Sequence, residues 1–333
     1  MSQEEKDVTA PTPGLAEETI GPDEAALTAE FIAFLTTMSA RHHPSGVMPR
    51  FNQGRAAGCV DAELTVPDGL PAELRVGLFA EPRTYQARIR FANAASQSDT
   101  ERDARGMSIK VSGVGGGNLT PGESNQDFIL NSHPVMMVGR TREFLELLQA
   151  VEEGGPKEAL FFLKHPHAAA VALASRHHAT SHLEIPYWST TPYLFGAGRA
   201  VKYSARPVST RTTPLPDSLT DNYLRERLAA HLAREDARFD FLVQFQTDSR
   251  KMPLEDASVE WREHDSPYRS VAHIRIPAQT VSVDRGPAGA ASCEQLSFNP
   301  WHALPDHRPL GDFNRARRDI YRAMAALRHE RHP

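Results

Sequence analysis

The chain has 333 residues, of which 40% are hydrophobic and 24% charged, and it carries a formal net charge of -5. These values are typical of a globular protein, and the acidic balance argues against a nucleic-acid-binding protein, which usually has a basic surplus. Two cysteines, Cys59 and Cys293, are too few for a disulfide framework or a structural zinc site, so Cys59 is predicted to be a small buried hydrophobic residue.

The first 25 residues are rich in Glu, Pro, Thr and Ala and are predicted to form a disordered tail, followed by a single domain over residues 26–333. They lack the basic start and apolar run of a signal peptide, and no segment of the chain is apolar for long enough to span a membrane. A cytoplasmic location is the expectation. The domain is predicted to begin with an amphipathic helix over Leu27–Ala40, with Phe31, Leu35 and Met38 on its buried face.

Alternation of apolar and polar residues then predicts strands. The clearest are Ala62–Val66, Tyr85–Phe91, Met107–Val111, Asp127–Leu130, Ala200–Ser204, Phe239–Phe245 and Val271–Ile276. A glycine-rich run at Gly113–Asn118 lacks the helix and the Lys-Ser/Thr pair of a phosphate-binding loop, so a hairpin connection is predicted there.

Helical patterns separate these strands. Residues 141–180 have Phe144, Leu145 and Leu148 on one face, Tyr223–Ala233 has leucines one turn apart, and the chain ends in a helix over Phe313–Glu330. Many strands without βαβ alternation predict an α+β fold, an antiparallel β-barrel of about eight strands with helical insertions.

The last helix places Arg317, Tyr321 and Arg328 on one face. A phenol, with an ordinary pKa of about 10, becomes a good iron ligand when metal coordination and a nearby cation favour the phenolate. Tyrosine is the axial haem ligand of catalases. An arginine and a tyrosine one turn apart are also common as a simple exposed pair, so this spacing alone does not show that Tyr321 binds iron.

Five motifs occur in the order and spacing that they have in haem catalases, and over Arg50 to Arg328 the chain resembles this family. The motifs are Arg50-Phe51-Asn52-Gln53 with the Gly-containing strand that follows, Arg90-Phe91-Ala92, Arg102-Asp103-Ala104-Arg105-Gly106, Asn131-Ser132-His133-Pro134 and Arg317-Arg318-Asp319-Ile320-Tyr321.

This resemblance implies that the chain binds haem b through a C-terminal ligand helix. Tyr321 would bind the iron, Arg317 would keep its phenolate charged, and Gln53 and Asn131 would orient a peroxide on the opposite side of the haem. The expected haem-binding residues are Arg50, Arg90 and Arg328 for the carboxylates, with Arg90 expected to point inward, and Asn52, Met136 and Phe144 in the pocket.

The chain departs from catalases at Gln53, which stands where the family has its distal histidine. A glutamine amide donates and accepts hydrogen bonds but does not carry protons at neutral pH, and loss of a general acid–base typically costs about 10²–10⁴-fold. Ala92 likewise replaces a serine, and Met136 a phenylalanine. His133 lies two residues beyond Asn131 and could supply the missing base, or it could make a structural hydrogen bond in its loop.

The expected function is a haem peroxidase that activates peroxide or transforms an organic hydroperoxide, with weak or no catalase activity. Three alternatives stay open: a biosynthetic tailoring enzyme, a non-catalytic haem-binding or sensing protein, and a shared fold without haem. The expected partner is a small-molecule peroxide or organic hydroperoxide, with no nucleic acid and no membrane span. A homodimer and peripheral contact with a membrane stay open.

Overall fold

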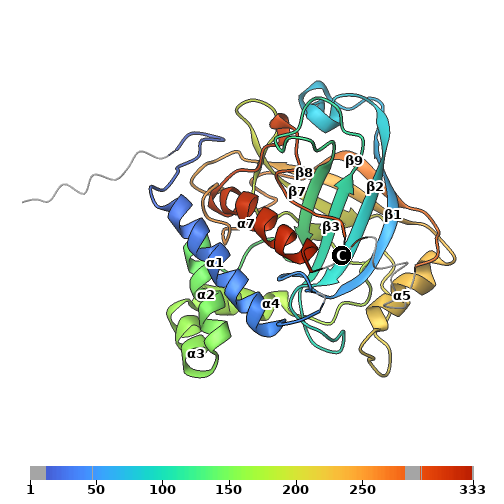
Figure 1. Ribbon diagram of the computed structural model, residues 1–333. Helices are drawn as coiled ribbons and strands as arrows, with labels where there is room; N and C mark the ends of the chain where they lie inside the picture. Colours follow the sequence, from blue (N-terminus) through green and yellow to red (C-terminus); the bar gives the residue numbers. More distant parts are fainter. Residues whose placement is uncertain (1–12, 47, 282–292, 294, 332–333) are drawn as a thin grey trace, which may run out of the picture.

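A closed antiparallel β-barrel forms the centre of the molecule, with most of the helices gathered on one side of it (Figure 1). The computed structural model describes residues 13–46, 48–281, 293 and 295–331. Eight strands follow one another around the barrel in the order β5-β4-β3-β2-β1-β9-β8-β7, and the pairing of β5 with β7 closes it. The short strand β6 pairs only with β7. The predicted barrel class is therefore confirmed.

Each predicted strand lies within an observed one, and only the two-residue strands β5 and β6 had no counterpart in the prediction. The strands are β1 (Ala56–Val66), β2 (Arg83–Asn93), β3 (Arg105–Val111), β4 (Gln126–Asn131), β5 (Tyr187–Trp188), β6 (Tyr193–Leu194), β7 (Ala200–Pro207), β8 (Ala237–Phe245) and β9 (Arg269–Ile276).

The predicted helices are present with small changes at their ends. The segment over residues 141–180 is divided into three helices, because Gly154 has a φ of +67° and His165-Pro166 interrupts the next turn. The helices are α1 (Glu24–His42), α2 (Thr141–Glu153), α3 (Gly155–Lys164), α4 (Pro166–Ser175), α5 (Tyr223–Leu232) and α7 (Asp312–His329), with short 3₁₀ turns at Ala72–Leu74, Gly77–Phe79 and Pro305–His307.

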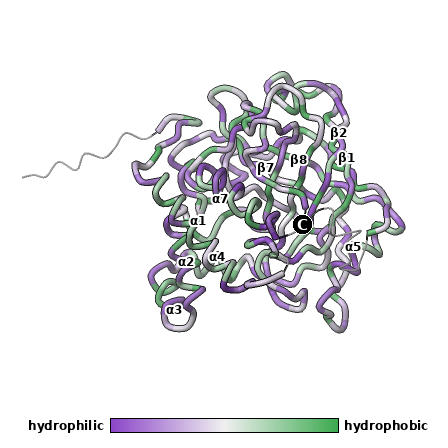
Figure 2. The backbone as a smooth tube through the Cα atoms, viewed as in Figure 1, coloured by the Kyte–Doolittle hydropathy of each residue, from purple (hydrophilic) through white to green (hydrophobic). Residues whose placement is uncertain are grey.

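The interior of the barrel is filled by aromatic rings. Phe241 contacts Phe128 at 4.7 Å between ring centroids, Tyr203 at 5.5 Å and Phe79 at 6.2 Å, and all four side chains are buried. Figure 2 shows hydrophobic and hydrophilic residues alternating along the barrel strands. Because neighbouring residues of a strand point to opposite faces, one set of strand side chains fills the barrel interior as a hydrophobic core.

Strands β3 and β4 are buried on both faces. Every residue of β3 is buried, and so are Gln126–Leu130 of β4. Met107, Ile109 and Val111 face the barrel core. Ser108 and Lys110, which alternate with them, therefore face outward, where other parts of the chain cover them. Helices α1, α2 and α7 lie on this covered side (Figure 1).

The glycine-rich run Gly113–Asn118 lies in the connection between β3 and its antiparallel partner β4, as predicted. No helix follows it, and Gly113, Gly116 and Gly117 have positive φ angles, which suit glycine in turns.

The N-terminal segment corrects one expectation. Residues 1–12 lie outside the described part of the chain, but residues 13–25 do not form the predicted disordered tail. Glu18 accepts hydrogen bonds from Arg308 and Arg315 at 2.6 Å, and Glu24 at the start of α1 binds the same Arg315. Arg315 also pairs with Glu255 at 2.8 Å, so it joins three carboxylates to α7.

The cysteines correct a second expectation. Cys59 on β1 is not an isolated buried hydrophobic residue but is only partly buried and forms a disulfide with Cys293. Their 234-residue separation in sequence gave no sign of this pairing.

In the described part of the chain, no helix is long and apolar enough to cross a membrane.

Replacement of Arg315 by leucine should lower the free energy of unfolding by about 2–4 kcal/mol, because three partly buried carboxylates would lose their shared cation. Urea denaturation measures this change. Arg322→Leu is the matched control, since Arg322 is exposed on the same helix and should change stability by less than about 1 kcal/mol. Equal losses in both variants would contradict the account.

This cluster also predicts a pH dependence. Burial opposes ionisation of Glu18, but hydrogen bonds from the Gly311 N–H, Arg308 and Arg315 outweigh it and lower the pKa of the carboxyl below 4.5. A lowered folded-state pKa gives stability that is present above 4.5 and disappears as the pH falls through the folded value. Wild-type protein should therefore lose more stability than Arg315→Leu between pH 5 and strongly acidic conditions.

A cavity between the barrel and the C-terminal helix

A cavity lies on the outer face of the barrel, between strands β2–β4 and helices α7, α1 and α2. The space between its protein atoms is about 1110 Å³ when the solvent in its open mouth is included. Nine of the ten site residues that the sequence singled out line it: Arg50, Asn52, Gln53, Arg90, Met136, Phe144, Arg317, Tyr321 and Arg328. The tenth, Asn131, touches the site through Gln53.

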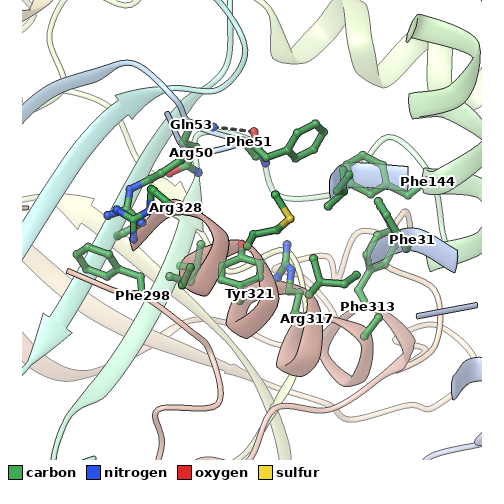
Figure 3. Close-up of a pocket in the computed structure, with 18 of the residues that line it drawn as sticks. Phe31, Arg50, Phe51, Gln53, Phe144, Phe298, Phe313, Arg317, Tyr321 and Arg328 are labelled. Carbon is green, nitrogen blue, oxygen red and sulfur yellow. Dashed lines mark hydrogen bonds between the residues drawn. The ribbon is translucent and has the colours of Figure 1, made fainter. Parts of the chain in front are cut away.

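One wall of the cavity is a buried and partly buried face of α7. Tyr321 projects from the middle of this helix into the cavity, with Arg317 one turn before it (Figure 3). The hydrogen bonds of Arg317 go to Thr191 Oγ1 at 3.1 Å and Asn314 Oδ1 at 3.4 Å. Thr191 and Asn314 thus fix the position of a cation beside the phenol.

The charge of Arg317 acts on the buried phenol of Tyr193. Burial raises the pKa of the neighbouring Tyr193 to about 12, and Arg317 is the main influence in the opposite direction. Tyr193 is fully buried in the barrel core and keeps its proton, whereas Tyr321 is only partly buried and faces the cavity. Of these two phenols, Tyr321 is therefore the one that a ligand in the cavity can reach.

The opposite wall carries Gln53, across the cavity from Tyr321 (Figure 3). Its backbone has a φ of +56°, an uncommon value for a residue other than glycine, and its N–H donates to the carbonyl oxygen of Ala94 at 2.9 Å. Its side-chain Nε2 donates to Asn131 Oδ1 at 3.1 Å. Two neighbouring amides are thus joined at this wall.

The amide of Gln53 packs directly against Gly106 on β3. A Cβ atom added at Gly106 would lie within 2.4 Å of Gln53 Cδ, Oε1 and Nε2, so the Gln53 amide occupies the space that a side chain at this position would need. Gly106 belongs to the Arg102–Gly106 motif, and its contact with Gln53 is a role that the sequence did not show.

Three arginines form the cationic end of the cavity. Arg90 and Arg328 are 1% and 2% exposed, and Arg50 donates to the carbonyl oxygens of Cys293 at 2.8 Å and Leu296 at 2.7 Å. Arg90 is buried as expected, but it points away from the barrel interior, in a row with Ser108 and Ile129 on the neighbouring strands.

Phe298 and a buried ion pair support this end, and sequence reasoning missed both. Arg50 and Lys110 each lie 5.5 Å from the centre of the Phe298 ring, and Lys110 pairs with the fully buried Asp127 at 2.8 Å. Among the described residues that line the cavity, none is acidic and none is histidine. A cavity with these cations and no carboxylate in its wall favours an anionic ligand group.

The other end of the cavity is aromatic. Phe144 on α2 lies 6.0 Å from Phe31 on α1 and 5.7 Å from Phe313 on α7. Figure 3 shows these three rings on the side away from Arg50 and Arg328. Met136 lines the cavity beside them. Phe31 and Phe313 were recognised in the sequence only as helix residues, because amphipathic spacing identifies a buried face without showing what it faces.

His133 does not line the cavity. Its Nδ1 lies 3.2 Å from the carbonyl oxygen and 3.4 Å from the N–H of Val135, in its own loop. This contact matches the structural role that the sequence left open for His133. In the described part of the chain, no cluster of three or more His, Cys, Asp or Glu side chains could hold a metal ion.

Comparison with known proteins supports the fold. No family model matches the chain, and no curated protein sequence does. Among solved structures, a fungal catalase has a TM-score of 0.67 at 17% identity, covering 87% of this chain and 62% of that one. Catalase A from Saccharomyces cerevisiae has a TM-score of 0.67 at 15% identity, covering 89% and 64%. A bacterial catalase has a TM-score of 0.67 at 16% identity, covering 98% and 64%.

The chain therefore has the fold of the catalases, as the resemblance implied. It spans less than two thirds of the length of the catalases it matches.

Substitution of Gly106 by alanine should displace the Gln53 amide and break its hydrogen bond to Asn131, at a cost of about 0.5–1.5 kcal/mol of stability, measured by chemical denaturation. Gly115→Ala is the control, because a Cβ atom there meets nothing within 4 Å. A Gly106→Ala variant as stable as this control would show that Gln53 is not held in the position described.

Proposed function

We propose that the chain binds haem b in this cavity, with Tyr321 as the iron ligand, and that it activates peroxide or transforms an organic hydroperoxide while having little or no catalase activity. The observation that carries the proposal is the placement of Tyr321 and Gln53 on opposite walls of one cavity with three arginines at one end.

The donor set suits haem. Haem is a flat apolar ring with two carboxylates at one edge, and the cavity joins an aromatic end to a cationic end formed by Arg50, Arg90 and Arg328. Guanidinium groups pair well with carboxylates. The phenol of Tyr321 would ligate from the α7 side, and Arg317, held by Thr191 and Asn314, would favour its ionised form.

Bound haem iron would supply the redox chemistry of O–O bond cleavage. The amides of Gln53 and Asn131 would orient the peroxide. With Gln53 Nε2 donating to Asn131 Oδ1, the pair presents the acceptor Gln53 Oε1 and the donor Asn131 Nδ2. A hydroperoxide has one O–H donor and acceptor oxygens, so it can use both.

Neither amide takes up a proton at neutral pH, and no histidine is present among the described lining residues to do so. Dismutation of hydrogen peroxide needs a group that moves a proton between the two oxygens, and its absence argues for slow dismutation. The aromatic end near Phe144 offers contact to an organic group that hydrogen peroxide lacks.

Gln53→His should increase oxygen release from hydrogen peroxide by at least about tenfold, because an imidazole can carry the proton that an amide cannot. An oxygen electrode measures this rate, with organic hydroperoxides compared in parallel. Asn52→His is the control, since Asn52 is a more exposed lining residue. Oxygen release no greater than that of the parent would refute this account of the pocket.

Tyr321→Phe should abolish or shift the Soret band of protein produced in haem-replete cells, because phenylalanine cannot ligate iron. Met324→Leu lies one turn away on the same cavity wall and should leave the band in place. An absorption spectrum distinguishes the outcomes, and an unchanged band in Tyr321→Phe would reject the ligand assignment. A wild-type protein without any Soret band would reject haem binding itself.

A further inference from the structure

Exposed apolar side chains are concentrated on the helices beside the barrel. Leu163 on α3 and Leu173 on α4 are 78% and 79% exposed, and Leu160 on α3 is 48% exposed. Isolated exposed leucines are common, but several on two consecutive helices indicate a surface that contacts something apolar.

These side chains are exposed although their helices are packed. Phe161 on α3 and Ala168 on α4 are buried in one hydrophobic cluster with Phe313 of α7. Leu160 and Leu163 therefore lie on the outer side of an anchored helix, and α3 lies at the outer end of the helical layer in Figure 1.

The chemistry of α4 is unusual for a helix with an exposed face. It contains no charged side chain, and its exposed positions are Pro166, His167, Ala170, Leu173 and Ala174. Figure 2 shows this helix as largely white to green. Water therefore meets an uncharged surface along the whole of α4.

Cations flank this surface. Lys164 ends α3 and Arg176 follows α4, both are exposed, and neither forms an ion pair within the described part of the chain. Lys157 pairs with Glu153, and Glu158 is the single acidic residue between residues 155 and 178. This region is thus basic in a chain whose net charge is -5.

We propose that the exposed faces of α3 and α4, named here the α3–α4 surface, bind peripherally to an anionic lipid bilayer. Its leucines enter the boundary between headgroups and acyl chains while Lys164 and Arg176 contact anionic headgroups. Helices with an apolar face and basic flanks lie in this manner on membranes. The absence of a membrane-spanning helix among the described residues agrees with this arrangement.

Charge favours lipid over a second copy of the chain as the occupant. A symmetric dimer on this surface would bring the same cations of two copies together. An anionic bilayer instead offers a complementary partner to Lys164 and Arg176. The proposal does not depend on the haem chemistry, although the shared cluster with Phe313 places the surface near the aromatic end of the cavity.

Flotation of the full-length protein with vesicles tests the proposal. The protein should float with phosphatidylcholine vesicles that contain phosphatidylglycerol, should float much less with phosphatidylcholine alone, and should be released by high salt. The double variant Leu163→Glu/Leu173→Glu should bind at least about tenfold more weakly. Lys164→Glu/Arg176→Glu should also bind more weakly, with a smaller dependence on salt.

Val208→Glu is the matched control, because Val208 is a 52% exposed apolar residue outside the helical layer and its substitution should leave binding unchanged. Circular dichroism checks that all variants are folded. Failure of the wild type to float, or equal binding of the leucine variant and the control, would overturn the proposal. So would a dimer in sedimentation equilibrium that Leu163→Glu/Leu173→Glu converts to monomers, because the surface would then join two copies of the chain.

Discussion

Burial of strands β3 and β4 on both faces is the constraint from which the rest of the structure follows. Their inner face belongs to the aromatic core, and their outer face carries Ser108, Lys110 and Asp127, all buried. Buried polar and charged groups must be paired, so the chain covers this face with α7, α1 and the segment around Phe298, which stacks near Lys110. The cavity is the space that remains between this outer face and the segments that cover it.

The two long walls of the cavity differ in how firmly they are determined. Gln53 is held by the hydrogen bond of its backbone N–H, by its side-chain bond to Asn131 and by the space that Gly106 leaves for its amide. Tyr321 depends on α7, and α7 is attached by Arg315 to three carboxylates from distant segments. The geometry between the two walls therefore depends on an ionic cluster that lies outside the cavity.

The fold was predictable because alternating strands and amphipathic helices are local patterns in the sequence. The order and spacing of the motifs that contain Arg50, Arg90, Asn131 and Tyr321 also matched those of one family along most of the chain. Contacts set by tertiary structure were not predictable. The contact between the Gln53 amide and Gly106 joins residues 53 positions apart in sequence, and the sequence around neither residue indicates this contact. Ordering of residues 13–25 was missed because Glu18 looks like a solvated charge until Arg308 and Arg315 are brought beside it.

The disulfide between Cys59 and Cys293 divides the chain in an unexpected way. The covalent loop that it closes contains most of β1, strands β2–β9 and helices α2–α5, whereas α1 precedes the loop and α7 follows it. A cross-link restricts chiefly the unfolded ensemble of the residues that it encloses. The disulfide thus stabilises the barrel and α2 directly, whereas α1 and α7, the other two helices around the cavity, are held only by non-covalent contacts. Displacement of α1 or α7 would open the cavity without breaking the closed loop.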